Sequence, residues 1–290
     1  LTASSSLYTD LDIETKKMLL RDLIFKDYRD KNMQRPPDTI KPMFKGMVDA
    51  IPITLSVDTI QLDNVEVQYS ELGVGKEVPA TLRFESIHGF ITQLTTIPQK
   101  QEAYKSFEAN LEANLNGAAP FTFTLEVPYD RDAFTAVASF GAFDLTGLSE
   151  TTRNMAGIEI VSGDVKKIHF EMRAAETSSH NKMQFDYENL KVHVVKENKQ
   201  HEAKNHPLVS SLANSALRNH NVPTHGKYIK ADYYSQRNVY RSPFNLMSHS
   251  LADGMMHIVP GSFVQSILGV NKDSKKAKKE KKHAKKHQKN

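Results

Sequence analysis

The sequence predicts a mainly β fold: an extended, curved antiparallel sheet with a groove-like face, and a few short capping helices near the C-terminus. Three observations predict it. Apolar and polar residues alternate in runs from Ile51 to Val195, and side chains on a strand point to opposite faces with period two. The runs recur at a spacing of roughly 10–15 residues with almost no helical pattern between them, as in a meander of antiparallel neighbours. Beyond residue 200 the alternation gives way to helical patterns that begin at Pro.

Residues 1–50 are expected to form an N-terminal segment with a strand, a Pro-rich linker and a short helix. Residues 14–28 fit either a helical stripe or a strand over Leu23–Tyr28. The RPPD sequence that follows is a break, because each Pro fixes φ and restricts the residue before it. From Thr39 to Ala50 we expect a short helix with Thr39 as its N-cap, since a Thr side chain can accept a hydrogen bond from a free N–H group of the first turn.

Residues 51–200 are expected to form the sheet. The alternation takes odd steps from Val57 to Ile60 and from Leu62 to Val65. These steps predict β-bulges or bends, because one extra residue moves the following side chains to the other face. Further strands are expected over Ala80–Phe84, Phe90–Leu94, Phe107–Leu115, Phe121–Val127 and Phe134–Leu145, followed by a turn-rich connection over Gly147–Gly157.

The stretch from Ile160 to Val195 shows the alternation most clearly. Two alternating runs, Lys167–Ala174 and Lys182–Tyr187, flank the polar sequence ETSSHN, so we predict an antiparallel pair of strands. After Tyr187 the apolar positions shift by one residue. We therefore predict a β-bulge or bend at Glu188–Asn189.

Residues 201–271 are expected to form a helical or irregular C-terminal cap. Helices are expected over 207–219 and 243–258, because each segment is amphipathic and begins at a Pro, which is favoured at the first helical position. The segment Tyr228–Tyr240 between them fits one more strand or an irregular return. We expect the two helices to cover an end of the sheet, which would otherwise attract other chains.

Charge is concentrated in a tail at residues 272–290. The chain has 290 residues and a net charge of +4, whereas the tail has ten Lys against Asp273 and Glu280, so the rest of the chain is mildly acidic. Three interpretations of the tail are open: a disordered, solvated arm, an attraction to an anionic membrane surface at roughly 1 kcal/mol per Lys, or contact with nucleic acid. We expect no nucleic acid, because no aromatic residues are interspersed among the Lys residues.

The sequence contains no recognisable pattern of catalytic or metal-binding residues. It has no Cys and no P-loop, GxGxxG, HExxH or GxSxG pattern. Three pairs of His residues are closely spaced, in a polar connection (His201 and His206), beside a turn (His220 and His225) and in the tail (His283 and His287), whereas metal ligands need a rigid shared geometry. We therefore expect a protein that is not an enzyme, without catalytic residues, cofactor or metal. No run of 18 or more apolar residues is present, and the start at Leu1 suggests a processed or truncated product.

The order of several segments resembles the C-terminal region of the large AsmA-like proteins of Gram-negative bacteria, especially the Bacteroidetes type. The resemblance covers roughly residues 20–260 and includes IPITLSVDTIQLDNVEVQYSE, FEANLEANLNGAAPFTFTLEVP and YRSPFNLMSHSLADGM. Its three main motifs are IxxxxVxY-E (Ile60, Val65, Val67, Tyr69, Glu71), SGxVxxIxF (Ser162, Gly163, Val165, Ile168, Phe170) and MxxxYxxLKV (Met183, Tyr187, Leu190, Lys191, Val192).

In that family a transmembrane helix anchors a long periplasmic sheet with a hydrophobic groove, which is associated with phospholipid transport or outer-membrane assembly. The resemblance therefore implies a periplasmic or cell-envelope protein, anchored to a membrane in its full-length form, with phospholipid or another envelope lipid as its ligand. It also implies that Leu19–Tyr28 is a strand. This chain departs from the family pattern in its missing anchor and its Lys-rich tail.

The resemblance implies that acyl chains occupy the apolar face of the sheet. Three alternatives remain open: this lipid groove, an apolar face packed against another part of the protein, and a structural role in which a sheet edge pairs with an envelope protein. The candidate groove residues are Phe107, Leu111, Phe121, Phe123, Leu125, Ile168, Phe170, Met172, Met183 and Phe185.

Overall fold

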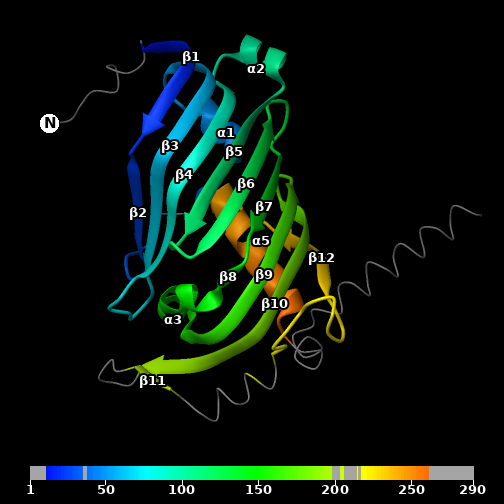
Figure 1. The fold of residues 1–290 in the computed structure, drawn as a ribbon. Helices are drawn as coiled ribbons and strands as arrows, with labels where there is room; N and C mark the ends of the chain where they lie inside the picture. The colour runs from blue at the N-terminus through cyan, green and yellow to red at the C-terminus, as the bar shows by residue number, and fades with distance from the viewer. Residues whose placement is uncertain (1–10, 35–37, 198–202, 206–213, 215–216, 261–290) are drawn as a thin grey trace, which may run out of the picture.

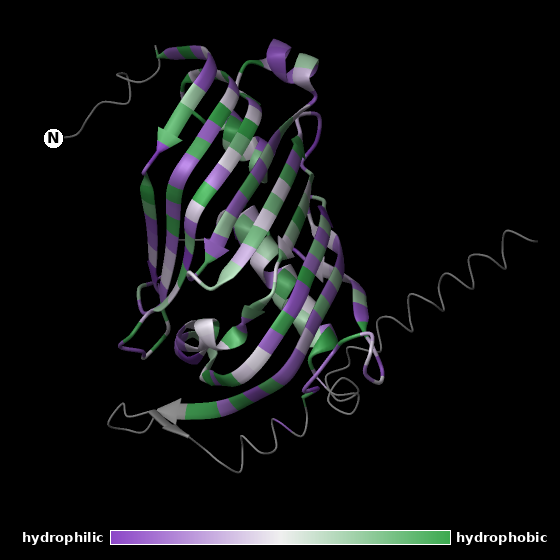
Figure 2. Cartoon of the chain, in the orientation of Figure 1, coloured by the Kyte–Doolittle hydropathy of each residue, from purple (hydrophilic) through white to green (hydrophobic). Residues whose placement is uncertain are grey.

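The chain folds around one large, open, mixed sheet (Figure 1). The structure is a computed structural model, and it describes residues 11–34, 38–197, 203–205, 214 and 217–260. The protein is mainly β, as predicted. Figure 2 shows apolar and polar residues alternating along the long strands β9 and β10.

The strands are β1 (Asp12–Arg21), β2 (Ile24–Asp30), β3 (Thr54–Leu72), β4 (Ala80–Thr95), β5 (Ser106–Leu115), β6 (Ala119–Pro128), β7 (Phe134–Phe140), β8 (Phe143–Asp144), β9 (Ile158–Ala174), β10 (Ser178–Glu197), β11 (Ala203–Asn205) and β12 (Lys230–Gln236). The helices are α1 (Phe44–Asp49), α2 (Pro98–Tyr104), α3 (Ser149–Ala156) and α5 (Pro243–Ile258), with one 3₁₀ turn at Leu145–Leu148. The spatial order of the main path is β1-β3-β4-β5-β6-β7-β9-β10-β11.

From β3 to β10 neighbouring strands on this path are antiparallel, as the meander pattern predicts. The N-terminal edge differs, because β1 and β2 both pair with β3 in parallel. Asp12 lies opposite Thr54 and Ile24 lies opposite Glu66, so the two short strands together follow nearly the whole of β3. The segment between β2 and β3, which contains α1, returns the chain to the start of β3. Parallel neighbours require such a crossover connection.

Two of the predicted bulges are confirmed. The pairing of β3 with β4 shifts between Leu62 and Val65, and Asn64 has φ of +54°. The pairing of β9 with β10 shifts around Glu188, and Asn189 has φ of +57°. Asn adopts this left-handed conformation more readily than most residues. At each bulge the strand bends while its apolar side chains stay on one face.

Of the two alternatives for residues 14–28, the strand is confirmed, because these residues lie in β1 and β2. Two local expectations were wrong. The first helix begins at Phe44 with Met43 at its N-cap, so Thr39 does not cap it. The backbone N–H of Lys41 donates to Val239 O, and Pro42 disfavours a helical conformation at Lys41.

The expected turn-rich connection over Gly147–Gly157 instead contains helix α3. This helix ends at Gly157, whose φ of +68° is the left-handed conformation common after a helix C-terminus. Its residues SETTRNMA lack an apolar periodicity strong enough to be noticed in the sequence. Contacts with β4 and β9 supply the packing that a short helix needs.

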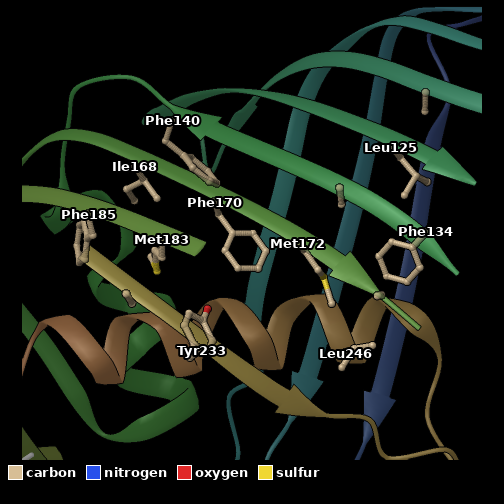
Figure 3. Packing of buried hydrophobic residues seen from close by; sticks show 14 of the residues in the cluster. Leu125, Phe134, Phe140, Ile168, Phe170, Met172, Met183, Phe185, Tyr233 and Leu246 are labelled. Atoms are coloured by element: carbon tan, nitrogen blue, oxygen red, sulfur yellow. The ribbon is translucent and has the colours of Figure 1, made fainter. Parts of the chain in front are cut away.

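The apolar face of β7, β9, β10 and β12 is covered by α5. The predicted helix over 243–258 is therefore confirmed, with Ser242 at the N-cap and Pro243 in the first turn. Figure 3 shows Phe170, Met172, Met183 and Tyr233 directed toward α5. The main core joins these strands to α1 and α5.

Helix α1 packs at one end of this core through aromatic contacts. The ring of Phe44 lies 4.9 Å from that of Phe134 and 5.0 Å from that of Phe244. The predicted helix over 207–219 falls mostly, and the Lys-rich tail entirely, outside the described residues. In the part of the chain that the structure describes, no helix is long and apolar enough to cross a membrane.

Candidate functional site

One transverse row of residues runs across the apolar face of the sheet. Each member lies directly opposite the next, and directly opposite residues share a face. The row passes through nine strands and contains Leu20, Leu62, Gly89, Leu111, Phe123, Ala138, Phe170, Met183 and Ala231. A continuous apolar strip therefore links the N-terminal edge of the sheet to its C-terminal edge.

At the C-terminal end the strip is covered tightly by α5. Phe170 is 4% exposed and Met183 is 2% exposed. A Cβ added at Gly254 of α5 would lie 2.4 Å from the Sδ of Met183 and 2.5 Å from the hydroxyl oxygen of Tyr233. This end of the strip therefore leaves no space for a ligand unless α5 moves.

At the N-terminal end the strip is only partly covered. Leu20, Leu62, Leu111 and Phe123 are all partly exposed. Leu20, Leu62 and Leu111 pack against a small second core that is centred on Val65, Ile87 and Ala113, whereas Phe123 packs against the edge of the main core. Partly buried residues packed against this second core include Val67, Phe84 and Phe121.

We define the open apolar strip as Leu20, Leu62, Phe84, Leu111, Phe121 and Phe123. The rings of Phe84 and Phe121 meet edge to face at 5.6 Å between centroids. This contact leaves both side chains partly accessible. The open apolar strip is therefore a part of the predicted groove face that stays accessible on β1 to β6.

The ten predicted groove residues divide into two groups. Leu111, Phe121 and Phe123 lie together in the open apolar strip. The other seven are buried in the main core: Phe107, Leu125, Ile168, Phe170, Met172, Met183 and Phe185. Three further members of the open apolar strip, Leu20, Leu62 and Phe84, were not selected as groove residues from the sequence. The alternation had nevertheless placed Leu62 among the apolar positions of its strand.

Three buried tyrosine hydroxyls in the main core are neutral and hydrogen-bonded. Burial raises the pKa of Tyr129 to about 12, and the Tyr129 hydroxyl donates to Gln93 O at 2.7 Å. Burial also raises the pKa of Tyr187 and of Tyr233, whose hydroxyls donate to Arg218 O and Ser250 O. These tyrosines therefore add no charge beneath the apolar face.

A chain of hydrogen bonds on the opposite face has the residue types of a nucleophilic triad. Ser139 Oγ lies 2.8 Å from His169 Nδ1, and His169 Nε2 lies 3.2 Å from Glu171 Oε1. The three side chains lie on the polar face of β7 and β9, two central strands whose backbone N–H groups pair within the sheet. Those N–H groups are not free to form an oxyanion hole. We therefore assign no catalytic role to this hydrogen-bonded group of Ser139, His169 and Glu171.

The N-terminal edge of the sheet is long and unpaired. Within the described residues, β1 and β2 have no neighbour on the side away from β3. Ile24, Phe25 and Tyr28 on β2 are 60%, 53% and 59% exposed. The other edge is short where it is formed by β12, which has seven residues. An unpaired edge of this length is a template for an added strand.

Neither a metal site in the part of the chain that the structure describes nor a similar known protein was found. In the described residues no group of three or more His, Cys, Asp or Glu side chains is arranged to hold a metal ion. The chain matches no protein-family model, and comparisons with curated proteins and with solved structures found no similar chain.

Proposed function

We propose that this protein is a lipid-binding or lipid-transfer portion of a bacterial envelope protein, and that it holds acyl chains on the open apolar strip. The observation that carries the proposal is the transverse row, which is buried under α5 at one end and partly exposed from β1 to β6. Burial of each acyl methylene on such a face contributes roughly 0.8 kcal/mol. The AsmA-like resemblance supports phospholipid as the ligand and the periplasm or cell envelope as the location.

The geometry limits where acyl chains can lie. Phe170 and Met183 are in direct reach of α5, so they stabilise the helix and do not line a free surface. Leu111 and Phe123 contact the ligand in this proposal. The Lys-rich tail would add attraction to anionic lipid headgroups, because clustered Lys residues favour an anionic membrane surface.

The experiment is lipid extraction and native mass spectrometry of the purified protein. We expect copurifying phospholipid, and we expect the Phe123→Asp variant to retain less than a tenth of it. Thr124→Asp is the matched control, because Thr124 is the next residue on β6, is exposed and points to the other face. Circular dichroism establishes that both variants fold, and Phe123→Ser replaces Phe123→Asp if the latter does not. Wild-type protein without lipid, or equal loss in the control, contradicts the proposal.

A second candidate function is a structural or assembly role through the N-terminal edge. The unpaired β1–β2 edge with its exposed Ile24, Phe25 and Tyr28 favours it. In this role an extended segment of an envelope protein adds as a strand beside β1 and β2.

Photocrosslinking in the native envelope tests this second role. A crosslinker at Phe25 is expected to capture one defined envelope protein, and a crosslinker at Tyr234 is the control, because Tyr234 is 68% exposed on β12 at the other edge. Equal labelling from both positions, or none from Phe25, argues against the edge as a docking site.

A further inference from the structure

The outer face of β3 to β6, opposite the open apolar strip, contains an open hollow of about 570 Å³. One wall is a row of residues that lie opposite each other across four strands: Gln61, Phe90, Asn110 and Thr124. The other wall includes His88 and Glu112. A second hollow of about 480 Å³, which includes Tyr104, lies beside it on the same face.

A kink in β4 accounts for the hollow. Gly89 has φ of +141°, and a Cβ added there would lie 2.1 Å from the carbonyl oxygen of Asn110. The pairing of β4 with β5 shifts just before it, between Glu85 and His88. The residues on the floor, such as Leu111, direct their side chains to the opposite face by the strand alternation. The hollow therefore lies where the sheet bends and the floor is backbone.

The residue types in the two hollows define the chemistry of a ligand. Neither lining contains Lys or Arg, whereas both contain Asp and Glu side chains, so a neutral ligand suits the two hollows better than an anionic headgroup or nucleic acid. The ring of Phe90 is 46% exposed. Carboxylate and amide side chains surround it in the lining of the first hollow. Ligand sites commonly combine aromatic surface with a few polar groups that fix orientation.

Several of these polar groups are free to bind. Among the residues that the structure describes, the side chains of Gln61, Asn110 and Glu112 have no hydrogen bond or ion pair within the protein. Amides both donate and accept hydrogen bonds, and a carboxylate accepts them. Sugar hydroxyls also donate and accept, and the C–H face of a sugar ring is apolar. An exposed Phe ring beside two amides and a carboxylate complements both features.

We propose that the hollow on the outer face of β3 to β6 binds a neutral oligosaccharide. Phe90 stacks against the face of one sugar ring, and Gln61, Asn110 and Glu112 hydrogen-bond its hydroxyl groups. The neighbouring hollow at Tyr104 takes the next unit of the chain. This site is distinct from the lipid site. Leu62, Leu111 and Phe123 of the open apolar strip contribute to the floor of the hollow, but their side chains point to the opposite face by the strand alternation, and the sugar contacts use other side chains.

Isothermal titration calorimetry of the full chain with three neutral tetrasaccharides, namely maltotetraose, cellotetraose and tetra-N-acetylchitotetraose, tests the proposal. We expect at least one to bind, with Phe90→Ala weakening its affinity at least tenfold and Phe90→Tyr within threefold of wild type. Phe25→Ala is the matched control, because Phe25 is similarly exposed but lies on β2 outside both hollows. Its affinity should equal that of the wild type.

Three outcomes overturn the proposal: none of the three sugars binds, binding survives Phe90→Ala, or Phe25→Ala weakens binding as much as Phe90→Ala. A tetralysine peptide is included in the titrations. If it binds and the sugars do not, the hollow is an acidic surface for cations. Lipid extraction from Phe90→Ala should match that from the wild type, so failure at this site is distinguishable from failure of the lipid proposal.

Discussion

Leu111 on β5 lies directly opposite Phe123 on β6, and both side chains remain partly exposed on the apolar face of the sheet. Farther along the same row, Phe170 and Met183 lie opposite each other in the same way but are buried. The difference between the two pairs is the presence of α5. Its position decides which part of the apolar face is core and which part is surface.

The close seating of α5 predicts that Gly254 tolerates no branched side chain. A Gly to Val change would force the new side chain into Met183 and Tyr233, whose nearest atoms lie within 2.5 Å of an added Cβ. Overpacking of a core costs typically about 1–3 kcal/mol. We expect Gly254→Val to lower the free energy of unfolding by that amount, measured by urea denaturation. Met256→Val in the same helix, where Met256 is 47% exposed, should change it much less.

Asn221 is expected to be essential for the stability of β12 and its connection. Its side chain is fully buried, and its Nδ2 donates to Phe185 O at 2.8 Å and to Ile229 O at 2.9 Å. Its Oδ1 accepts from the N–H of Ile229 at 2.9 Å. Each buried group left without a partner costs about 1–3 kcal/mol.

We therefore expect Asn221→Ala to lower the free energy of unfolding by about 3 kcal/mol. Thermal denaturation with an exposed control, Asn219→Ala, measures the difference. An effect no larger than that of the control would show that water replaces the lost hydrogen bonds at this site.

We predict that the stability of the N-terminal edge depends on pH through the carboxyl group of Glu71. Burial is the largest single influence on its carboxyl and acts to raise the pKa, but hydrogen bonds from Lys31 and Tyr69 and the charges of Lys31 and Arg29 outweigh it. The pKa of Glu71 is therefore lowered from 4.5. A lowered pKa in the folded state stabilises the fold above the unfolded-state pKa, and this contribution is lost as the pH falls through the folded-state value.

We expect Glu71→Gln to speed amide hydrogen exchange in β2 at pH 7, with a loss of about 1 kcal/mol. The difference from the wild type should shrink when stability is compared at acidic pH, below the lowered pKa, where the wild-type carboxyl is also neutral. Glu126→Gln, on an exposed position of β6, is the control. A difference that persists unchanged in acid would contradict an electrostatic origin.

Gly89 is predicted to tolerate no side chain. Both its positive φ and the 2.1 Å approach of Asn110 O oppose a Cβ. We expect Gly89→Ala to separate β4 from β5 locally and to destabilise the protein by about 2 kcal/mol or more, since strain of this kind costs about 1–3 kcal/mol. Urea denaturation measures it, and Gly73→Ala is the control, because its nearest neighbour is a flexible Lys76 side chain at 3.0 Å.

Much of the sheet was predictable because strand alternation is a local signal. The runs at Phe107–Leu115 and Phe121–Val127 became β5 and β6 with bounds within two residues. The bulge at Glu188–Asn189 was predictable for the same reason, since an odd step in the pattern has one simple geometric cause. The start of helix α5 was predictable from Ser242 and Pro243, which are residue types favoured at the N-cap and in the first turn.

Other features depend on contacts between distant residues, so local patterns did not reveal them. Parallel pairing of β1 with β3 is decided by where the crossover returns the chain. Helix α1 starts late because Lys41 is held by Val239, nearly 200 residues away. The alternation likewise placed Leu111 and Phe170 on one face, but it carried no information on which of them α5 would cover.

The parallel pairing at the N-terminal edge also has a consequence for how the protein folds. Thr15 pairs with Val57, and Tyr28 pairs with Ser70, so every strand pairing of this edge closes a loop of 42 residues and none is a hairpin. Non-local pairing of this kind forms slowly, and such elements open below the free energy of global unfolding. We therefore expect β1 and β2 to join the sheet last and to leave it first, so that β3 becomes a temporary edge whenever they detach.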